Sequence, residues 1–541
     1  MRIDPIKLPD TNTLVADYKY NFSKVRDKFD FNPFDENTWR ERVRDLQSQD
    51  YNRQGLVDVL TTMNDRWDAS EPTFQNINKL KDSKTTAVVA GQQAGLLTGP
   101  LYTVHKVISV LQLAKQKESE LEEPVVPIFW IAGEDHDFAE INHLHMKDQG
   151  RMKKIQVHTD VNEKSSVSDL PFNQEAVQNW LSKVFQETKE TEYTSELYRR
   201  MLGVIQTSHS YTDFFAKVIY TLFPNEGLIL LDAHDRTIRE LESSYFLDLI
   251  HNNGKIADGV FSSVQENKQQ RYPVSLDSED NDAHLFFHKN GERILLARDQ
   301  GGNFVGKKGE VTFSKEELLN VASEQPWLLS NNVVSRPLMQ EYLLPVLAFI
   351  GGPGEISYWS ALKPAFHAVG LTMPPVVPRL SFTMIDKKSE QLLEQFKISI
   401  EEAVQYGTVN HKLNWLASTE NPPIGRLADQ VKQEMEGIHD PLKKKAAELG
   451  PDMEALAQKN LKYIQQSIEF LEKRMVQSVE DKYTHELEDF DSLNLLIRPA
   501  GGLQERMWSV IPWLNLYGHD VFERMNTQNL SFYHSHYIVR I

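Results

Sequence analysis

The fold is decided by TTAVVAGQQAGLLTGPLYTVHKVISVLQLAKQKE, residues 85–118, and by PVVPIFWIAG, residues 124–133. The first stretch opens with a short β-branched run that ends in Gly91, which predicts a strand and a glycine turn, and then shows helical periodicity. The second stretch is a continuous apolar run, which is typical of a parallel strand buried on both faces. Together they predict a right-handed βαβ unit.

Two later stretches repeat the pattern of an apolar run that ends in a polar or glycine turn and leads into helical sequence. They are GLILLDAHD, residues 227–235, and VLAFIGGPGEISYW, residues 346–359. The repeat predicts an α/β fold with a doubly wound sheet. Between them, HLFFHKNGERILLARDQ, residues 284–300, predicts a β-hairpin inserted on the sheet, with Asn290 and Gly291 as its two-residue turn.

Composition limits the classes of function. The 541 residues carry a formal net charge of −18, which disfavours nucleic acid and anionic membranes as partners and favours small molecules and proteins. The sequence has no apolar run of about 18 residues and starts without a signal-peptide pattern, so we expect a cytoplasmic protein. It contains no cysteine, which excludes disulfides, cysteine-ligated metals and thiol nucleophiles.

The chain divides into four predicted segments. Residues 1–80 are a polar, helical lead-in, 81–386 form the α/β core, 387–490 form an antiparallel helical coiled coil, and 491–541 return to the core. The coiled coil is predicted from a heptad seam and from the helix break at Gly450 and Pro451. The seam residues are Leu427, Val431, Ile438, Leu442 and Leu449 on the first arm and Leu461, Ile464, Ile468, Leu471 and Met475 on the second. We expect a homodimer through this hairpin; the alternative is a set of ordinary amphipathic helices packed on the core.

Residues 91–100, GQQAGLLTGP, join the first strand to its helix, and we refer to them as the glutamine loop. Its glycines allow a ligand to approach the backbone, and the following helix start offers unpaired amides to an anion. The candidate catalytic residues here are Gln92, Gln93 and Thr98, and the candidate substrate-binding residues are Gly91, Gly95 and Gly99. The alternative is a glycine-rich turn that serves helix packing. The loop is neither GxGxxG nor a P-loop, so it predicts no particular cofactor.

Residues 133–143, GEDHDFAEINH, follow the second strand and place ionisable groups beside the glutamine loop. The candidate catalytic residues are Glu134, Asp135, His136 and Asp137. Carboxylates on both sides of His136 would favour its charged form, which suits a general acid or base. Two alternatives stay open: a metal site, although the spacing matches no established zinc pattern, and helix capping by Asp135 or Asp137.

Residues 351–359, GGPGEISYW, follow a third apolar run. Glycines at this density indicate close backbone approach, so Glu355 and Tyr358 are candidate substrate-binding residues. A plain tight turn is an equally good explanation.

Four motifs resemble the BshC family of bacillithiol biosynthesis: GQQAGLLTGPLYTVHK, WIAGEDHDFAEINH, GGPGEISYW and RPAGGLQERMW. They occur in order over essentially the whole chain, and the first two are distinctive. The resemblance implies a Rossmann-like core, an inserted coiled coil that supports dimers, and the addition of cysteine to the amine of glucosaminyl-malate. By position it assigns Gln92, Gln93, Thr98, Glu134, Asp135, His136, Asp137 and Glu355 to the pocket.

Adenylate-forming enzymes place an HxGH-like signature at their first strand-to-helix turn, and here Leu97 and Pro100 replace both histidines. No KMSKS-like loop is visible, although joining a carboxylate to an amine in water requires activation. We therefore expect ATP or ADP at a second site, at the foot of the hairpin, where backbone groups near Met384 read a base edge. The candidate residues are Met384, Ile385, Asp386, Phe490, Asp491, Ser492, Leu493 and Arg506. The alternative role of Arg506 is an ion pair that anchors the hairpin.

Two other functions compete with amide formation. In the first, residues 134–143 are a metal centre that hydrolyses an amide or a phosphoester. In the second, the protein binds a nucleotide without catalysis and recruits partners through its hairpin. Our leading hypothesis uses no metal.

Overall fold

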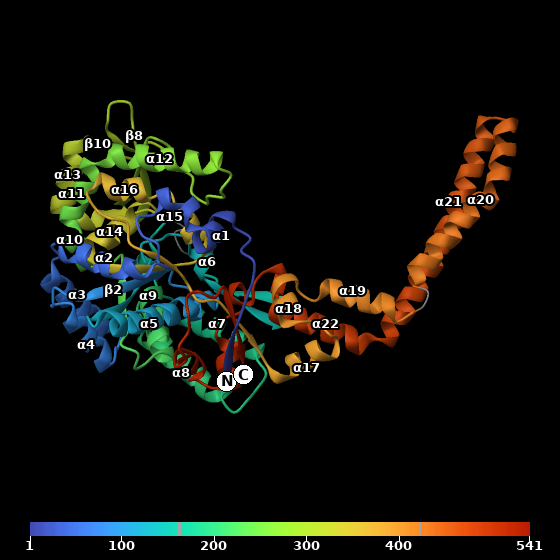
Figure 1. Ribbon diagram of the computed structural model, residues 1–541, viewed down its shortest axis with the longest axis horizontal. Helices are drawn as coiled ribbons and strands as arrows, with labels where there is room; N and C mark the ends of the chain where they lie inside the picture. Colours follow the sequence, from blue (N-terminus) through green and yellow to red (C-terminus); the bar gives the residue numbers. More distant parts are fainter. Residues whose placement is uncertain (160–163, 421–422) are drawn as a thin grey trace. The chain divides into compact units, whose positions relative to one another are not determined.

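The structure is a computed structural model that describes residues 1–159, 164–420 and 423–541 (Figure 1). Contacts between residues divide the chain into two compact units. The first comprises Met1–Asp148, Met152–Met384 and Gln504–Ile541, and the second comprises Gln149–Arg151 and Ile385–Leu503. Within the described residues, no helix is long and apolar enough to cross a membrane.

The first unit contains the predicted doubly wound sheet. Five parallel strands lie in the order β13-β12-β2-β3-β6. Their bounds are β2 (Thr86–Gln92), β3 (Val125–Ile131), β6 (Ile229–Asp232), β12 (Val346–Gly351) and β13 (Val376–Pro378). Chain order reverses between β2 and β12, because β3 and β6 lie on one side of β2, and β12 and β13 lie on the other. This switch point is where open α/β sheets bind ligands.

Burial explains why these strands show continuous apolar runs. Every residue of β3 is buried, so neighbouring elements cover both faces of the sheet. Helix α5 (Tyr102–Leu121) packs against β2, β3 and β12. In the register of β2 and β3, Gly91 is opposite Trp130 and Gln92 is opposite Ile131, so the polar segments that follow the two strands emerge at the same edge.

The predicted hairpin is confirmed as β7 (Asp282–Lys289) and β8 (Glu292–Arg298). Asn290 and Gly291 both have positive φ, of 53° and 79°, as a two-residue type I′ turn requires. The hairpin is not an extension of the parallel sheet. It belongs to a separate five-stranded sheet, in the order β10-β9-β8-β7-β11, with β9 (Phe304–Gly306), β10 (Thr312–Phe313) and β11 (Leu329–Asn331).

The two ends of the chain lie together (Figure 1). The lead-in was expected to be helical, but it starts with β1 (Arg2–Ile6), which pairs antiparallel with β15 (His536–Arg540) at the C-terminus. In this small sheet β15 lies between β1 and β14 (Phe382–Ile385), and β4 (His143–Asp148) and β5 (Arg151–Gln156) form a further pair. Pairing with a distant strand leaves no local signal in residues 2–6.

Eighteen helices of the described residues belong to the first unit, α5 among them. The others are α1 (Thr13–Tyr20), α2 (Glu36–Gln47), α3 (Arg53–Arg66), α4 (Glu71–Lys79), α6 (Phe138–Ile141), α7 (Gln174–Gln186), α8 (Thr194–Thr207), α9 (Tyr211–Leu222), α10 (Arg236–Leu241), α11 (Ser243–His251), α12 (Asn253–Gln269), α13 (Lys315–Glu324), α14 (Ser335–Leu343), α15 (Pro353–Trp359), α16 (Lys363–Ala368), α23 (Ile511–Tyr517) and α24 (Val521–Asn526).

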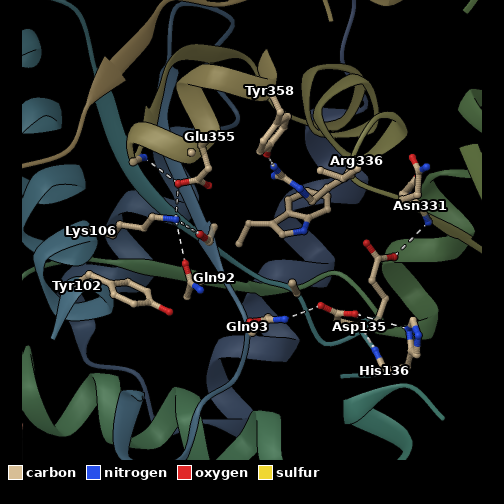
Figure 2. Close-up of a pocket in the computed structure, with 18 of the residues that line it drawn as sticks. Gln92, Gln93, Tyr102, Lys106, Asp135, His136, Asn331, Arg336, Glu355 and Tyr358 are labelled. Carbon is tan, nitrogen blue, oxygen red and sulfur yellow. Dashed lines mark hydrogen bonds and ion pairs between the residues drawn. The ribbon is translucent and has the colours of Figure 1, made fainter. Parts of the chain in front are cut away.

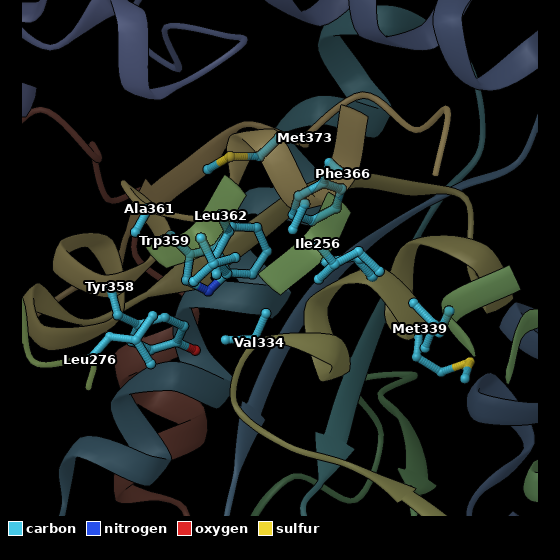
Figure 3. Close-up of a cluster of buried hydrophobic side chains, with 14 of the residues drawn as sticks. Ile256, Leu276, Val334, Met339, Tyr358, Trp359, Ala361, Leu362, Phe366 and Met373 are labelled. Atoms are coloured by element: carbon cyan, nitrogen blue, oxygen red, sulfur yellow. The ribbon is translucent and has the colours of Figure 1, made fainter. Parts of the chain in front are cut away.

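A large apolar cluster includes residues of α14 and α15 (Figure 3). Trp359 is fully buried and stacks on Phe349 of β12, with ring centroids 4.5 Å apart. Phe366 packs against the same indole at 5.9 Å. Stacked aromatic pairs add to the stabilisation from burial, so the end of β12 and the start of α15 have a rigid base.

The second unit is helical in the residues described. It contains α17 (Lys387–Gln395), α18 (Ile400–Tyr406), α19 (Val409–Ser418), α20 (Ile424–Leu449), α21 (Pro451–Lys482) and α22 (Thr484–Ile497). Helices α20 and α21 lie side by side as the predicted hairpin, and Gly450 is the break between them (Figure 1). Helix α22 passes through the predicted boundary at 490/491, and the second unit continues to Leu503.

The face that α20 turns to α21 differs from the predicted seam. Ala428, His439 and Ala446 are the buried residues of α20, and His439 bonds Asn460 of α21 at 3.0 Å. The predicted seam residues of α20 are exposed, with Ile438 at 71% and Leu442 at 66%. On α21, Leu461, Ile464 and Ile468 are half-buried, whereas Leu471 and Met475 are exposed. Small residues permit close helix packing, which leaves the large apolar residues outside.

The buried Arg42 of α2 provides a test of the core. Its guanidinium pairs with the buried Glu341 of α14, and Nε donates to the carbonyl of Val346 at the start of β12, at 3.0 Å. Burial raises the pKa of Glu341 to about 8, and Arg42 opposes that effect. Arg42→Ala removes the ion-pair partner of this buried carboxyl group, and we expect the broken pair to lower the free energy of unfolding by about 3–5 kcal/mol.

Chemical denaturation measures this loss. Arg40→Ala on the same helix is the matched control, because Arg40 is exposed and should change stability by less than about 0.5 kcal/mol. Equal stability of the two variants would show that the buried pair does not support the sheet.

Candidate functional site

A cavity of about 640 Å³ lies at the switch point of the parallel sheet (Figure 2). The ends of β2 and β3 form one part of its wall, and the segment between β12 and α15 forms another. The antiparallel sheet contributes Phe286, Arg293 and Leu295. Residues from distant parts of the first unit therefore meet in the place where the topology predicts a ligand.

Lys106 of α5 joins β2 to α15. Its Nζ donates to the carbonyl of Gly91 at 2.7 Å and to Oε1 of Gln92 at 2.9 Å, and it pairs with Oε2 of Glu355 at 2.7 Å. Burial lowers the pKa of Lys106, and Glu355 opposes that effect. All three N–H groups of the ammonium are used, so Lys106 positions Gln92 and Glu355 on the wall (Figure 2).

Glu134 is buried behind the end of β3. Its carboxylate pairs with Arg239 and accepts from the Asn331 amide at 3.3 Å. Arg239 also binds Glu242 at 2.9 Å, so one guanidinium lies between two carboxylates. Burial raises the pKa of Glu242 to about 8, and the repulsion from Glu134 acts in the same direction. Glu134 therefore holds the end of β3 to α10 and β11.

Asp135 connects the acidic segment to the glutamine loop. Its Oδ2 accepts from Gln93 Nε2 at 2.7 Å, and its Oδ1 accepts from the backbone amide of His136 at 2.8 Å. Gln93 also donates to Glu140 at 2.9 Å. Each carboxylate oxygen can accept a second hydrogen bond. Asp135 is half-buried, so it can still accept a hydrogen bond from a ligand.

Arg293 of β8 determines the role of His136. Its Nη1 lies 3.3 Å from His136 Nδ1, and a guanidinium can only donate, so Nδ1 accepts and the ring proton is on Nε2. The sequence predicted carboxylates around this ring, but the group that meets Nδ1 is a cation; Asp135 is farther away, at 3.7 Å. The ring therefore offers a hydrogen-bond donor, Nε2–H.

Arg293 is itself fixed by its surroundings. It donates to the hydroxyl of Ser330 at 3.1 Å and to the Asn331 carbonyl at 2.5 Å, and its guanidinium carbon lies 3.8 Å from the centroid of the Phe286 ring. Its Nη1 also lies 3.6 Å from Oδ1 of Asp135. A stacked and paired guanidinium has little freedom, so the donor at Nδ1 of His136 is held in place.

Arg336 and Tyr358 form the wall above β12. Arg336 of α14 donates to the Tyr358 hydroxyl at 2.9 Å and to Oε1 of Gln340 at 3.3 Å (Figure 2). Burial raises the pKa of Tyr358, so its phenol keeps its own proton and can donate it onward.

The segment Gln504–Arg506 closes the wall from the C-terminal side. Glu505 is fully buried and holds Arg379 with two hydrogen bonds, of 2.5 and 2.8 Å, while its Oε2 lies 2.7 Å from Nδ1 of His105. The charge of Arg379 keeps the pKa of Glu505 well below its usual range although burial acts to raise it. Arg506 is exposed and lines the cavity.

The structure brings most of the predicted catalytic and substrate-binding residues, and Arg506 of the predicted nucleotide site, to the cavity wall. Those on the wall are Gly91, Gln92, Gln93, Glu134, Asp135, His136, Glu355, Tyr358 and Arg506. Arg506 was expected at a separate nucleotide site, but it lines the same cavity as the glutamine loop.

Four of the predicted catalytic and substrate-binding residues lie off the wall. Thr98 is buried, and Gly95 and Gly99 pack against each other, since a Cβ on Gly95 would lie 3.1 Å from the Gly99 Cα. This part of the loop serves helix packing, the alternative left open above, and the Leu101 amide at the helix start donates to the Trp508 carbonyl at 2.9 Å. Asp137 is exposed and makes no capping hydrogen bond.

The remaining residues of the predicted nucleotide site belong to different units. Met384 is in the first unit, and Ile385, Asp386, Phe490, Asp491, Ser492 and Leu493 are in the second. The Met384 amide is not free to read a base edge, because it donates to Gln504 Oε1 at 2.8 Å, and its carbonyl accepts from Gln504 Nε2 at 2.8 Å. Asp386 caps α17 by accepting from the Ser389 amide at 2.7 Å. ATP or ADP stays a prediction.

Sequence reasoning missed the cations of the wall, which are Lys106, Arg293, Arg336 and Arg379. Lys106 had a visible signal, because it stands in the apolar part of the helix that follows the glutamine loop. Arg336 and Arg379 had none, since they come from segments with no glycine turn or acidic cluster beside them. Arg293 follows the turn of Asn290 and Gly291, which the sequence predicted only as part of a hairpin. Among the described residues, no three His, Asp or Glu side chains gather as metal ligands.

Comparisons with known proteins agree over the whole chain. The N-terminal Rossmann-like domain of bacillithiol biosynthesis BshC matches residues 1–380, and the C-terminal coiled-coil domain of BshC matches residues 382–541. Proteins from Oceanobacillus iheyensis, Bacillus licheniformis and Bacillus cereus are 43%, 37% and 39% identical, each over 100% of both chains. All three are named "Putative cysteine ligase BshC". This chain therefore belongs to the BshC family of bacillithiol biosynthesis.

Proposed function

We propose that this protein joins the carboxylate of cysteine to the amine of glucosaminyl-malate, with formation of an amide, in the cavity at the switch point. The names of its relatives support a cysteine ligase. The observation that carries the proposal is the pair Asp135 and His136. They are adjacent on the wall and have opposite hydrogen-bond polarity, since Asp135 accepts and His136 Nε2–H donates.

Amide formation needs both polarities. The amine nitrogen must lose a proton as it bonds to the acyl carbon, and a carboxylate can receive that proton. Negative charge develops on the acyl oxygen, and an N–H donor stabilises it. Asp135 suits the first role and His136 the second. Gln93 holds the Asp135 carboxylate through Oδ2, which keeps its orientation fixed during the reaction.

Activation of the cysteine carboxylate stays a prediction. Without activation the leaving group would be hydroxide or oxide, so a co-reactant has to convert the carboxylate oxygen into a better leaving group. ATP or ADP at a second site is our expectation from the sequence, which leaves open whether that nucleotide takes part in the reaction. Leu97 stands where an adenylate-forming enzyme has the first histidine of its signature. It is buried and off the cavity wall, so no side chain at this position can bind a phosphate.

We also propose that the protein is a homodimer that forms through its helical hairpin. Helix α20 exposes an apolar stripe of Leu427, Val431, Ile438, Leu442 and Leu449. These residues repeat at steps of four and seven, so they share one side of the helix, next to the face that packs on α21. Large apolar residues at such spacing are typical of a surface that a second helix covers.

Substitutions at Asp135 and His136 test the reaction. We expect Asp135→Asn and His136→Ala each to lower the rate of product formation by about a hundredfold or more, since proton transfer and charge stabilisation are lost. Mass spectrometry of the cysteine adduct measures the rate, and the melting temperature should stay near that of the wild type.

Asp137→Asn is the matched control in the same segment. The sequence placed Asp137 with the catalytic residues, but its exposed position off the wall predicts near wild-type rates. A fall in melting temperature that parallels the loss of activity in Asp135→Asn would assign the carboxylate a structural role and contradict the proposal.

Arg293 provides a test of the proton on His136. Arg293→Gln removes the guanidinium that fixes Nδ1 as an acceptor, so we expect the ring to lose its single tautomer and the reaction rate to fall by about tenfold. Nitrogen-15 spectra of His136 should show the Nε2–H tautomer in the wild type. Arg293→Lys should recover part of both readouts because lysine is a cation that can only donate, whereas the glutamine amide can also accept. A ring protonated on Nδ1 in the wild type would contradict the assignment.

Charge in the exposed stripe tests the dimer. Ile438→Asp combined with Leu442→Asp should give a monomer by light scattering, because burying an unpaired carboxylate in an interface costs several kcal/mol. Gln433→Asp with Ala447→Asp, at exposed positions on the far side of α20, is the control and should leave the mass unchanged. An unaltered dimer in the first variant would place the interface elsewhere.

A further inference from the structure

The charges of the cavity wall do not balance. Five cationic side chains line it: Lys106, Arg293, Arg336, Arg379 and Arg506. Three of them have a carboxylate partner, which is Glu355 for Lys106, Asp135 for Arg293 and Glu505 for Arg379. Among the described residues, no carboxylate lies within 4.0 Å of a nitrogen of Arg336 or Arg506, in contrast to the other three cations of the wall.

The remaining acids near the cavity do not cancel this excess. Glu134, the third acid of the wall, is already paired with Arg239. Glu140 accepts from Gln93, but it is exposed and does not line the cavity. Two arginines without a carboxylate therefore face the cavity of a protein whose net charge is −18. Such an excess suits a ligand with two negative charges.

The surroundings of Arg336 fix its side chain more firmly than those of the exposed Arg506. It is half-buried on α14 and keeps only two acceptors, the Tyr358 hydroxyl and Gln340 Oε1, so most of its five N–H donors stay available. These acceptors hold the guanidinium from behind, and its carbon lies 5.4 Å from the centroid of the Phe349 ring. Figure 2 shows the side chain pointing from α14 toward the centre of the cavity.

The end of β2 lies beside this arginine. A Cβ on Gly91 would lie 3.6 Å from Nη1 of Arg336, within van der Waals contact, so the guanidinium lies next to the start of the glutamine loop. Tyr358 accepts from Arg336 and keeps its own proton, so its O–H can donate to the same ligand. A guanidinium fork with an adjacent hydroxyl is a good match for a carboxylate.

We propose that Arg336 and Arg506 form a dicarboxylate subsite, with Arg336 as the inner anchor and Arg506 as the cation at the exposed rim. The ligand class is a small dicarboxylate or a group that carries one. This proposal rests on the proposed function, in which the dicarboxylate is the malate group of glucosaminyl-malate. Arg336 and Arg506 then bind and orient the amine substrate, whereas Asp135 and His136 act at the reacting atoms.

Titration calorimetry on the full chain without turnover tests the subsite. Glucosaminyl-malate is titrated into the wild type, Arg336→Gln, Arg336→Lys and Arg506→Gln. Loss of a charge-assisted bidentate contact should weaken binding by about 10- to 100-fold in Arg336→Gln. Arg336→Lys keeps the positive charge but loses the bidentate guanidinium, so its affinity should lie between those of the wild type and Arg336→Gln. Arg506→Gln should weaken binding less than Arg336→Gln does, because Arg506 is exposed.

Matched controls separate the subsite from a general loss of structure. Arg199→Gln, at an exposed position on α8, should bind as the wild type does. Glucosamine, which lacks the malate group, should bind the wild type and Arg336→Gln equally, and free malate should compete with glucosaminyl-malate only where Arg336 is present. If Arg336→Gln has a lower melting temperature, Arg506→Gln still tests the subsite. Arg506 is exposed, so its substitution should weaken ligand binding without lowering the stability of the protein.

The outcomes distinguish this proposal from the proposed function. Binding of glucosaminyl-malate within twofold of the wild type in both glutamine variants would overturn the subsite, even if the wild type makes the amide. Wild-type binding that depends on both arginines would support the subsite, even if no amide forms with cysteine. A wild type that binds neither glucosaminyl-malate nor malate would overturn both proposals.

Discussion

The buried ammonium of Lys106 holds together the two segments that meet at the switch point. It uses its three N–H groups on the carbonyl of Gly91, the side chain of Gln92 and the carboxylate of Glu355. A buried ammonium is costly unless it is paired, so neither β2 nor α15 can move without leaving a charge unsatisfied. Glu355 is also held by the Gly352 amide at 2.8 Å. The parallel sheet brings the loop after β2 next to the loop between β12 and α15. The polar contacts of Lys106 then fix the distance between these two loops.

The parts of the fold that the sequence predicts are those with local causes. The strands of the parallel sheet are buried on both faces, so each appears as an unbroken apolar run, and Asn290 with Gly291 predicts its turn because both residues tolerate positive φ. The positions of Gln92, Asp135 and Glu355 followed from one rule, that carboxyl ends of parallel strands share an edge. Strand β1 escaped prediction because its partner β15 lies at the other end of the chain.

The failures in the site have a different cause. Glycines at the spacing of Gly95 and Gly99 look the same whether a ligand or another backbone approaches them, and here they approach each other. Arg293 lies 157 residues from His136 in the sequence, and their contact depends on how β8 of the antiparallel sheet lies against the segment after β3, which no local pattern reveals. The sequence places acids beside His136, and the fold adds a cation that the sequence does not reveal: Nδ1 lies 3.7 Å from Asp135 Oδ1 and 3.3 Å from Arg293 Nη1. The local sequence predicts that His136 reaches the cavity. It does not predict which of its two ring nitrogens carries the proton.

The acidity of the whole protein does not conflict with an anionic substrate. Charges on the distant surface are screened beyond about 8 Å at physiological ionic strength, so most of the net charge of −18 is not felt inside the cavity. What a bound carboxylate meets there is the half-buried guanidinium of Arg336, in a region where the surrounding protein lowers the effective dielectric constant and strengthens each pair. Arg293 and Arg379 line the same cavity but have carboxylate partners of their own. Recognition of an anion therefore depends on which arginines the fold leaves unpaired, and the total number of acids on the surface has little influence on it.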